Sequence, residues 1–592
     1  MKSFFPTFLA SFLGVFAAFA LCIFILIGIG ISGMANAESY SADSVLKLTL
    51  EDFIPEKTDN IDEQTSMFGG HTEAIGLRRT LKLIETAAKD SKIKGILLEN
   101  NHVSVGQASI LELREGLEKF KESGKFIYSY ADMHSQGSYL LCSVADSMFL
   151  NPQGSVDLIG MGAMIPFLKN MLDKVGIDMN IFYAGNFKSA TEPFRLEEMS
   201  DYNRLQTREF LEDMKAIMLS HIAANRKLSI EQLETIIDEY GGRTAKKALA
   251  SGLVDALYYK DQIDELLKKQ TGVKEGRKIK YVTLSKYNML ADVDDDESGS
   301  DKIAIVNTEG EIIYGSDDKG IISEKKYIGI LSKIRNDKNI KAVVLRVNSP
   351  GGNAFSSEAI WRELELIKAA GKPLIASFGD YAASGGYYIA AGADKIIAQP
   401  NTLTGSIGVF MMFPDASRLL NDKIGITFDT VKTDEYAAGF SPVMKLSEKE
   451  KMIAQESTLE IYDLFMERVS KGRKLSIEKT KDIAQGRVWT GKKAKEIGLV
   501  DELGNLDKAI TIAAQNANLS KYKTVEYPII KVDFISTIIK EISKGSSGDD
   551  DAAISLFSTK AEKTLLDQYR QYKAIFHLST PNARLPFIFN AN

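Results

Sequence analysis

The sequence is poor in the residues that most often hold metals or form disulfides. Its 592 residues include two cysteines, Cys22 and Cys142, and five histidines. Neither cysteine belongs to a CxxC or mixed Cys/His spacing, so we expect no disulfide framework and no structural metal. No histidine occurs between positions 222 and 576. A serine hydrolase site in the second half of the chain would therefore need a base other than a local histidine.

Clusters of basic residues are also missing. The net charge is −6 and is spread along the chain, which argues against a nucleic-acid partner. Hydrophobic residues make up 44% and charged residues 26% of the sequence, as in folded globular proteins. A chain of 592 residues exceeds one ordinary domain, so two or more domains are expected.

The N-terminal region contains a long uncharged run, FLASFLGVFAAFALCIFILIGIGI (8–31). Such a helix covers about 36 Å, enough to cross a hydrocarbon core of ~30 Å. A cleaved signal peptide is the alternative, because MANA (34–37) ends in an A-x-A pattern. Lys2 is the only charge before the run, which favours a cytoplasmic N-terminus. We expect a single-pass anchor in the inner membrane, with the rest of the chain on the outer, periplasmic side.

The same pattern occurs twice along the chain. The matched pieces are IKGILLEN (93–100) with IKAVVLRV (340–347), Asp132 with Asp380, Pro152 with Pro400, and SGLVD (251–255) with IGLVD (497–501). Asp132 and Asp380, like Pro152 and Pro400, are 248 positions apart, and an internal repeat of this kind predicts a duplicated domain. We expect the copies to span residues 45–290 and 301–592, joined by the acidic, turn-rich segment ADVDDDESGSD (291–301).

Within each copy, short apolar runs alternate with helical patterns. Residues 341–347 are rich in Val and Leu, and the next segment places Ile360, Leu364 and Ile367 on one helical face. A second strand is expected at 373–378, followed by a short helix from Tyr387. The first copy repeats this helical face with Ile110, Leu113, Leu117 and Phe120. This alternation predicts an α/β fold with parallel strands.

The stretch GDYAASGGYYIA (379–390) contains a serine among small residues. Ser384 could be a turn or helix-capping residue, or a nucleophile at the start of a helix. The pattern is not G-x-S-x-G, because position 382 is alanine. An oxyanion would need backbone N–H donors. Gly385, the residue after the serine, is one candidate, and Gly352 in NSPGGNA (348–354) is another.

The base for Ser384 is the harder assignment. His134 lies in the first copy, two residues before the position that matches Ser384, and we interpret it as a surface-loop histidine. Lysine is the other common base. A lysine can accept a proton only when it is neutral, so burial must lower its pKa well below the ordinary value of about 10.4.

Four motifs carry a resemblance to a known family. RVNSPGG (346–352), GDYAASGGYYIA (379–390), LTGSIG (403–408) and YAGNFKSATEPF (183–194) resemble the long, two-domain bacterial form of signal peptide peptidase A, also called protease IV. The resemblance covers essentially the whole chain. It implies tandem domains of the Clp-protease/crotonase-like α/β fold. It also implies Ser384 as nucleophile, Lys188 as general base and Ser406 as the residue that orients the lysine.

The same resemblance implies a function. It predicts a membrane-anchored serine endopeptidase that degrades remnant signal peptides, and other extended apolar peptides, after their release from preproteins. A homo-oligomer, in this family a tetramer, is expected, with no cofactor, no metal and no nucleic acid. Whether Lys188 and Ser384 meet within one chain or between chains stays open.

The repeat gives separate support for a shared site. The position that matches Ser384 in the first copy is Gln136, and the position that matches Lys188 in the second is Ala437. Each copy therefore holds one half of a serine–lysine pair. Two other hypotheses stay open: an acyl-CoA enzyme of the crotonase type, and a membrane scaffold without activity.

Overall fold

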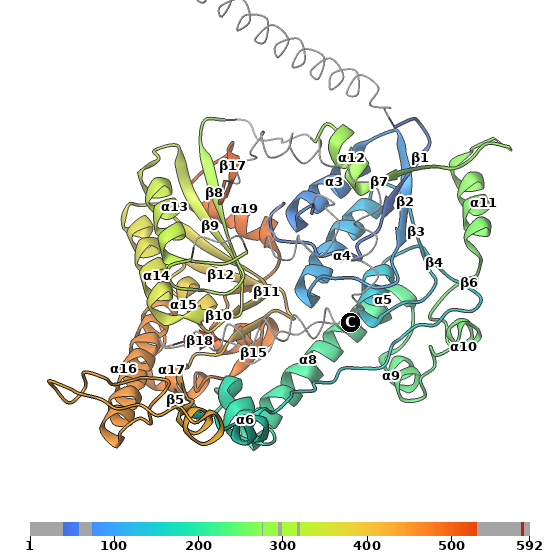
Figure 1. The fold of residues 1–592 in the computed structure, drawn as a ribbon. Helices are drawn as coiled ribbons and strands as arrows, with labels where there is room; N and C mark the ends of the chain where they lie inside the picture. Colours follow the sequence, from blue (N-terminus) through green and yellow to red (C-terminus); the bar gives the residue numbers. More distant parts are fainter. Residues whose placement is uncertain are drawn as a thin grey trace, which may run out of the picture.

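The computed structural model describes residues 40–58, 74–274, 276–293, 299–316, 320–529 and 582–584. The expected membrane span at residues 8–31 lies outside them. Among the described residues, no helix combines the length and apolar character needed to cross a bilayer. The ribbon has two α/β lobes, and the long helix α8 (Asp201–Arg226) runs between them (Figure 1).

The first lobe is built on a parallel sheet with the strand order β6-β4-β3-β2-β1-β7. Its strands are β1 (Ser44–Leu48), β2 (Ile93–Glu99), β3 (Phe126–Ala131), β4 (Ser147–Leu150), β6 (Ala256–Leu257) and β7 (Lys280–Thr283). Its helices are α3 (Leu77–Lys89), α4 (Gln107–Lys121), α5 (Gln136–Cys142), α9 (Ile230–Asp238), α10 (Ala245–Ala250), α11 (Lys260–Thr271) and α12 (Leu284–Leu290).

The second lobe repeats this order as β16-β12-β11-β9-β8-β17, again with parallel pairs. Its strands are β8 (Lys302–Glu309), β9 (Ile340–Ser349), β11 (Leu374–Ala383), β12 (Lys395–Ala398), β13 (Leu403–Gly405), β15 (Val488–Thr490), β16 (Glu502–Leu503) and β17 (Lys523–Tyr527). Its helices are α13 (Glu324–Asn336), α14 (Ala354–Ala369), α15 (Gly385–Ala390), α16 (Glu448–Arg473), α17 (Ile477–Ile483), α18 (Gly491–Ile497) and α19 (Leu506–Asn516), with a π-helical turn η2 (Leu419–Ile424). The duplicated parallel α/β architecture is confirmed.

The duplication extends to buried polar contacts. The hydroxyl of Tyr139 donates to the carbonyl of Leu253, and the hydroxyl of Tyr387 donates to the carbonyl of Leu499, each at a distance of 2.8 Å. Both rings are buried, so each hydroxyl needs such an acceptor. These matched bonds tie α5 and α15 to equivalent places in their lobes.

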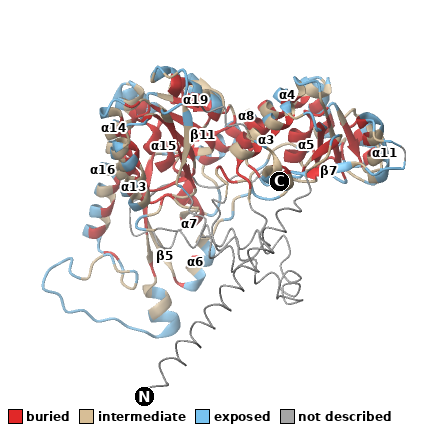
Figure 2. Ribbon diagram, turned by 90° about the horizontal axis from the view of Figure 1, so that it is seen from above, coloured by how far each residue is buried: buried red, intermediate tan, exposed pale blue. Residues whose placement is uncertain are grey.

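Each lobe has its own apolar core, visible as separate buried regions in Figure 2. The residues expected on one helical face of α14, namely Ile360, Leu364 and Ile367, are all buried. The equivalent side chains of α4 are buried as well. Removing these faces from water supplies most of the stabilisation that positions the strands.

One expected element differs. The strand predicted at 373–378 continues to Ala383, and α15 begins at Gly385 rather than at Tyr387. Beyond Phe378 the pairing of β11 with β9 shifts register, to Ala382 opposite Ser349, and β13 replaces β12 as the second partner of β11. This second pairing keeps the backbone extended right up to Ser384.

Part of the first repeat packs on the second. After α6 (Lys169–Val175), strand β5 (Asp178–Ala184) pairs antiparallel with β14 (Val409–Asp415). The chain then forms η1 (Ser189–Thr191) and α7 (Glu192–Arg195) and enters α8. The boundaries 45–290 and 301–592 stay predictions, since this segment belongs to one repeat by sequence and contacts the other.

Buried charges also join the lobes. Arg346 of β9 forms ion pairs of 2.8 Å with Glu56 and with Glu112 of α4, and all three side chains are buried. Asp380 of β11 accepts hydrogen bonds from the backbone N–H and the hydroxyl of Ser109, at 2.9 and 2.7 Å. Removing one partner of a buried pair costs about 3–5 kcal/mol, so these contacts hold the lobes in register.

Candidate active site

Ser384 lies between the end of β11 and the start of α15. Its φ is +55° and its ψ is −116°, and its side chain makes no capping bond to the helix. A helix cap has extended dihedral angles instead, so Ser384 is not an ordinary capping residue. Its N–H donates to the carbonyl of Gly405 over 2.8 Å, and its own carbonyl accepts from Tyr388. A positive φ at a non-glycine residue costs on the order of 1–3 kcal/mol, and such residues cluster at functional sites.

Lys188 reaches Ser384 within the same chain. It immediately precedes η1, in the segment of the first repeat that packs on the second lobe. Its Nζ lies 2.8 Å from Ser384 Oγ and 3.1 Å from both the hydroxyl and the carbonyl oxygen of Ser406. The side chain is 1% exposed. In this structure the contact between Lys188 and Ser384 is made within a single chain.

The environment of Lys188 favours the neutral amine. Burial lowers the pKa of Lys188 well below its ordinary value. Within the described part of the chain, no carboxylate forms an ion pair with it to oppose that effect. A neutral amine has two N–H donors and one lone pair. The donors fit the two oxygens of Ser406, and the lone pair then faces the hydroxyl of Ser384.

Ser406 follows β13 in a turn with a φ of +48°. The turn is fixed because the N–H of Ser406 donates to the carbonyl of Arg487 over 2.7 Å. The residue is fully buried, so its hydroxyl and carbonyl have little choice of partner other than Lys188. The geometry fits the orienting role expected from the sequence.

The two glycine-rich turns adjoin each other. A methyl group built on Gly385 would lie 3.1 Å from the backbone nitrogen of Gly352. At Gly352, where φ is +151°, a methyl group would lie 2.1 Å from the carbonyl oxygen of Ile312, so only glycine fits. The structure thus brings Gly352, Gly385 and Ser384 to one place, where two N–H groups could hold an oxyanion.

The loop that carries Lys188 rests on residues that the sequence analysis did not find. The N–H of Phe187 donates to the carbonyl of Gln485 over 2.8 Å, and a methyl group on Gly486 would lie 2.6 Å from Lys188 Cβ. Gln206 of α8 donates to the carbonyl of Phe187 over 3.0 Å. In the sequence, QGR (485–487) looks like any turn, and nothing distinguishes Gln206 from other helix-surface amides.

The matching position of the first repeat is filled. Gln136 accepts from the N–H groups of Ile159 and Gly160, at 3.1 and 3.0 Å, and donates to the carbonyl of Gly160. This amide fixes the loop that is equivalent to the one carrying Ser406. Ala437, the counterpart of Lys188, lies on an exposed segment.

The expectation that His134 lies at the surface is wrong. The side chain is fully buried, because its backbone bridges to Val156 and draws the loop inward. Its Nδ1 lies 2.9 Å from the hydroxyl of Ser138, which itself donates to the carbonyl of Asn100. Burial lowers the pKa of His134 to about 3. The ring is therefore a neutral core residue of the first lobe.

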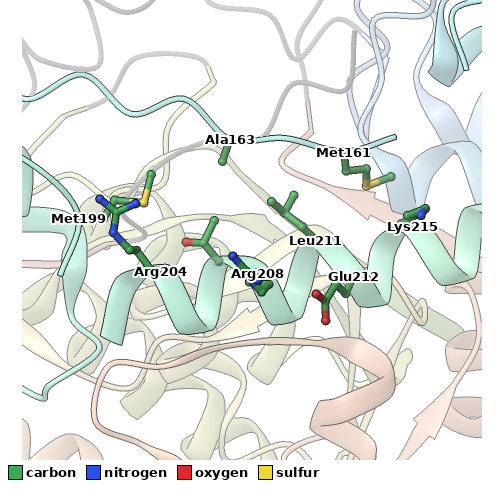
Figure 3. A pocket seen from close by; sticks show the side chains of 9 residues that line it. Met161, Ala163, Met199, Arg204, Arg208, Leu211, Glu212 and Lys215 are labelled. Carbon is green, nitrogen blue, oxygen red and sulfur yellow. The ribbon is translucent and has the colours of Figure 1, made fainter. Parts of the chain in front are cut away.

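A pocket of about 340 Å³ lies along α8 (Figure 3). Side chains from α8, such as Leu211, and from the segment 161–163, such as Met161, line it. Both of these residues also pack on the apolar cluster behind Ala383. Neither Lys188 nor Ser384 lines the pocket, which flanks the end of the strand that leads to Ser384.

Comparison with known proteins places the chain in a family. The model of peptidase family S49 matches residues 119–274 and again residues 367–520. The chain belongs to peptidase family S49. The two matches fall on the two repeats, so this serine peptidase contains the family domain twice, and the resemblance drawn from the four motifs is confirmed.

Several curated relatives share long stretches of sequence with this S49 peptidase. Protease 4 of Haemophilus influenzae is 35% identical over 90% of this chain and 89% of its own length. Serine protease SPPA, chloroplastic, of Arabidopsis thaliana is 31% identical over 85% and 73%, respectively. Putative signal peptide peptidase SppA of Enterococcus faecium is 36% identical over 41% of this chain and 72% of its own. A solved structure of a ClpP1 point mutant from Listeria monocytogenes aligns with 35% of this chain and 94% of its own, at 16% identity and a TM-score of 0.24.

Proposed function

We propose that this S49 peptidase is a membrane-anchored endopeptidase that uses Ser384 as nucleophile and Lys188 as general base, and that degrades signal peptides after their release from preproteins. The 2.8 Å contact between Lys188 Nζ and Ser384 Oγ, in a site without access to water for the lysine, carries the proposal. A buried amine beside a strained, buried serine fits a base and its nucleophile better than a structural pair.

The reaction follows from these positions. The lone pair of Lys188 takes the proton of Ser384 as Oγ attacks the peptide carbonyl carbon. The N–H groups of Gly352 and Gly385 stabilise the oxyanion, while Ser406 holds the amine in place. Collapse of the intermediate breaks the C–N bond, and the ammonium group of Lys188 protonates the leaving amine. The neutral amine of Lys188 then takes a proton from a water molecule, which hydrolyses the acyl-enzyme.

The proposed location and substrate rest on the N-terminal sequence and on the family. The run at residues 8–31 is long enough to anchor the chain in the inner membrane, with the catalytic lobes on the outer side. A site held at the bilayer surface suits extended, apolar peptides that leave the membrane. For each lobe we propose the Clp-protease/crotonase type of fold, which the repeated strand order supports.

We also propose a homo-oligomer, a tetramer by analogy with the family, on an argument from the repeat. Strands β5 and β14 join the two repeats within one chain. Their counterparts are residues 427–433 and 161–167, which form no strand in the described chain. Phe428 and Val431 of the first segment are 47% and 102% exposed. Pairing of these segments between chains would cover them and repeat the contact seen within the chain.

One labelling experiment tests the catalytic assignment. A fluorophosphonate probe should label the wild-type chain once, at Ser384, and the Ser384→Ala variant should neither be labelled nor cleave peptides. Ser138→Ala is the matched control, because Ser138 is also a buried serine and lies 2.9 Å from a possible base. Labelling that survives Ser384→Ala would overturn the proposal, and absence of any labelling would favour a crotonase-type enzyme or a scaffold.

A further inference from the structure

One buried side chain of α8 contacts the loop of Lys188 on both sides of the lysine. Gln206 is 1% exposed. Its Nε2 donates to the carbonyl oxygen of Phe187 over 3.0 Å and to the hydroxyl of Ser189 over 2.9 Å. Because Phe187 and Ser189 are the chain neighbours of Lys188, these two bonds fix the backbone from which the amine extends.

The oxygen of the same amide binds the second repeat. It accepts the N–H of Val488 in β15 over 3.1 Å. Val488 pairs with Gly405 of β13, and the carbonyl of Gly405 accepts the N–H of Ser384. The carbonyl of Arg487, the residue before Val488, accepts the N–H of Ser406. The amide therefore links the loop of the lysine to the strand that fixes the backbone of both serines.

The three contacts require the chemistry of an amide. An amide has two N–H donors and an acceptor oxygen, and the two donors and the oxygen are all used here. A carboxylate of the same shape only accepts, and a methionine of similar length offers no N–H donor. Loss of the amide would leave buried partners in the lysine loop and in β15 without their bonds, which is costly, so the loop would move to satisfy them.

The second repeat lacks this amide, and it also lacks the lysine. Helices α8 and α16 both have 26 residues, and each begins after a capping serine, Ser200 or Ser447. The sixth residue is Gln206 in α8 and Ile453 in α16, and Ile453 is 37% exposed. The counterpart of the lysine in that repeat is Ala437. The amide is thus present in the repeat that keeps the lysine and absent from the one that lost it.

We propose that Gln206 is a positioning residue, which holds Lys188 Nζ within reach of Ser384 by joining the lysine loop to β15. The inference rests on the proposed function, in which Lys188 is the base. A displacement of about 1 Å near a reacting group can cost a hundredfold in rate, so Gln206→Met should lower kcat by at least about tenfold. Because Gln206 is buried and has no surface for a peptide, KM should stay within about twofold of the wild type.

The pH profile separates positioning from a general loss of stability. The acid limb of kcat/KM reports the pKa of Lys188, which burial holds well below its ordinary value. A loop that moves away from β15 admits water to the amine, so the pKa rises and the limb moves to higher pH. We expect a shift of at least about half a pH unit in Gln206→Met. Ser189→Ala, which removes one of the three contacts, should shift the limb in the same direction. An unmoved limb in Gln206→Met, or in Ser189→Ala where the first variant does not fold, overturns the proposal.

Gln455→Met is the matched control. This glutamine of α16 donates to the carbonyl of Tyr183 over 3.5 Å, in the strand β5 that precedes the lysine loop. The variant therefore loses the same chemical group and a bond to the same segment, but it keeps the link between that loop and β15. Its kcat and its acid limb should equal those of the wild type. An equal shift of the limb in Gln455→Met and Gln206→Met would overturn the specific role of Gln206.

A stability measurement makes the test independent of turnover. The difference in free energy of unfolding between Lys188→Met and its parent grows as the pH falls below about 10.4 and levels off at the folded-state pKa of Lys188. In the Gln206→Met background it should level off at a higher pH than in the wild-type background. The same pH in both backgrounds overturns the positioning role. Absence of turnover in the wild-type chain, with this shift intact, counts against the proposed function alone.

Discussion

Replacing Lys188 with methionine should abolish activity and stabilise the fold. The amine is the proposed base, so its loss should stop the reaction. Methionine has nearly the same length and no charge, so it can fill the same buried space. The lysine, in contrast, must enter a fully buried site without a carboxylate partner in the described chain. The native fold therefore carries a desolvation cost that the variant lacks.

The size of this effect depends on pH in a defined way. Burial lowers the pKa of Lys188 in the folded state below the unfolded value of about 10.4, so the unfolded chain binds more protons. Above that value both states hold a neutral amine, and the cost is absent. As the pH falls below it, the cost grows by about 1.4 kcal/mol per pH unit. It levels off once the pH falls below the folded-state pKa.

The assay is chemical unfolding of both proteins between pH 6 and about 10.5, with the free energy of unfolding as the readout. The difference between Lys188→Met and the wild type should widen by about 1.4 kcal/mol per unit as the pH falls from about 10.4, and the pH at which it levels off measures the folded-state pKa. Lys246→Met, a change at an exposed lysine of α10, controls for the substitution itself. A difference that is flat over this whole range would refute a neutral Lys188, and with it the proposed base.

Three further substitutions have expected outcomes. Ser406→Ala removes one of the two oxygens that hold Lys188 Nζ and should lower kcat by about tenfold, with fluorophosphonate labelling of the folded chain retained. Gly352→Ala places a methyl group 2.1 Å from the carbonyl oxygen of Ile312 and should lower kcat far more than Ser406→Ala; equal kcat values would argue against an oxyanion role for Gly352. His134→Ala should leave kcat unchanged and lower the melting temperature, because the ring is a buried part of the first core, and a large loss of kcat would restore a histidine mechanism.

The repeated fold could be predicted from the sequence, for a physical reason. Buried strands and amphipathic helices leave regular patterns, and the face of Ile360, Leu364 and Ile367 was readable from spacing alone. The length of β11 was not readable in the same way. The segment between Phe378 and Ser384 contains Gly and Asp, which indicate a turn, yet its new pairing with β13 keeps it extended.

The proposed catalytic pair shows a second limit of sequence reasoning. Lys188 and Ser384 are 196 positions apart, and no spacing rule joins residues on different repeats. The family resemblance and the comparison of the two copies identified Lys188 and Ser384, whereas the residue types around each of them did not. The burial of His134 was missed because a histidine in a polar segment gives no sign of the bridge to Val156 that draws it inward. Tertiary pairing, which leaves no local pattern, decided each of these cases.

A site shared between two repeats places a demand on the contacts that join them. The distance of 2.8 Å between Lys188 Nζ and Ser384 Oγ joins side chains from two repeats, and a displacement of about 1 Å at a reacting group can cost a hundredfold in rate. The pairing of β5 with β14 and the hydrogen bond from the N–H of Phe187 to the carbonyl of Gln485 therefore have a functional consequence beyond stability, because they hold the loop of Lys188 on the lobe that contains Ser384. After the duplication, each repeat could lose one residue of the serine–lysine pair only because such contacts hold the residue kept by one repeat close to the residue kept by the other.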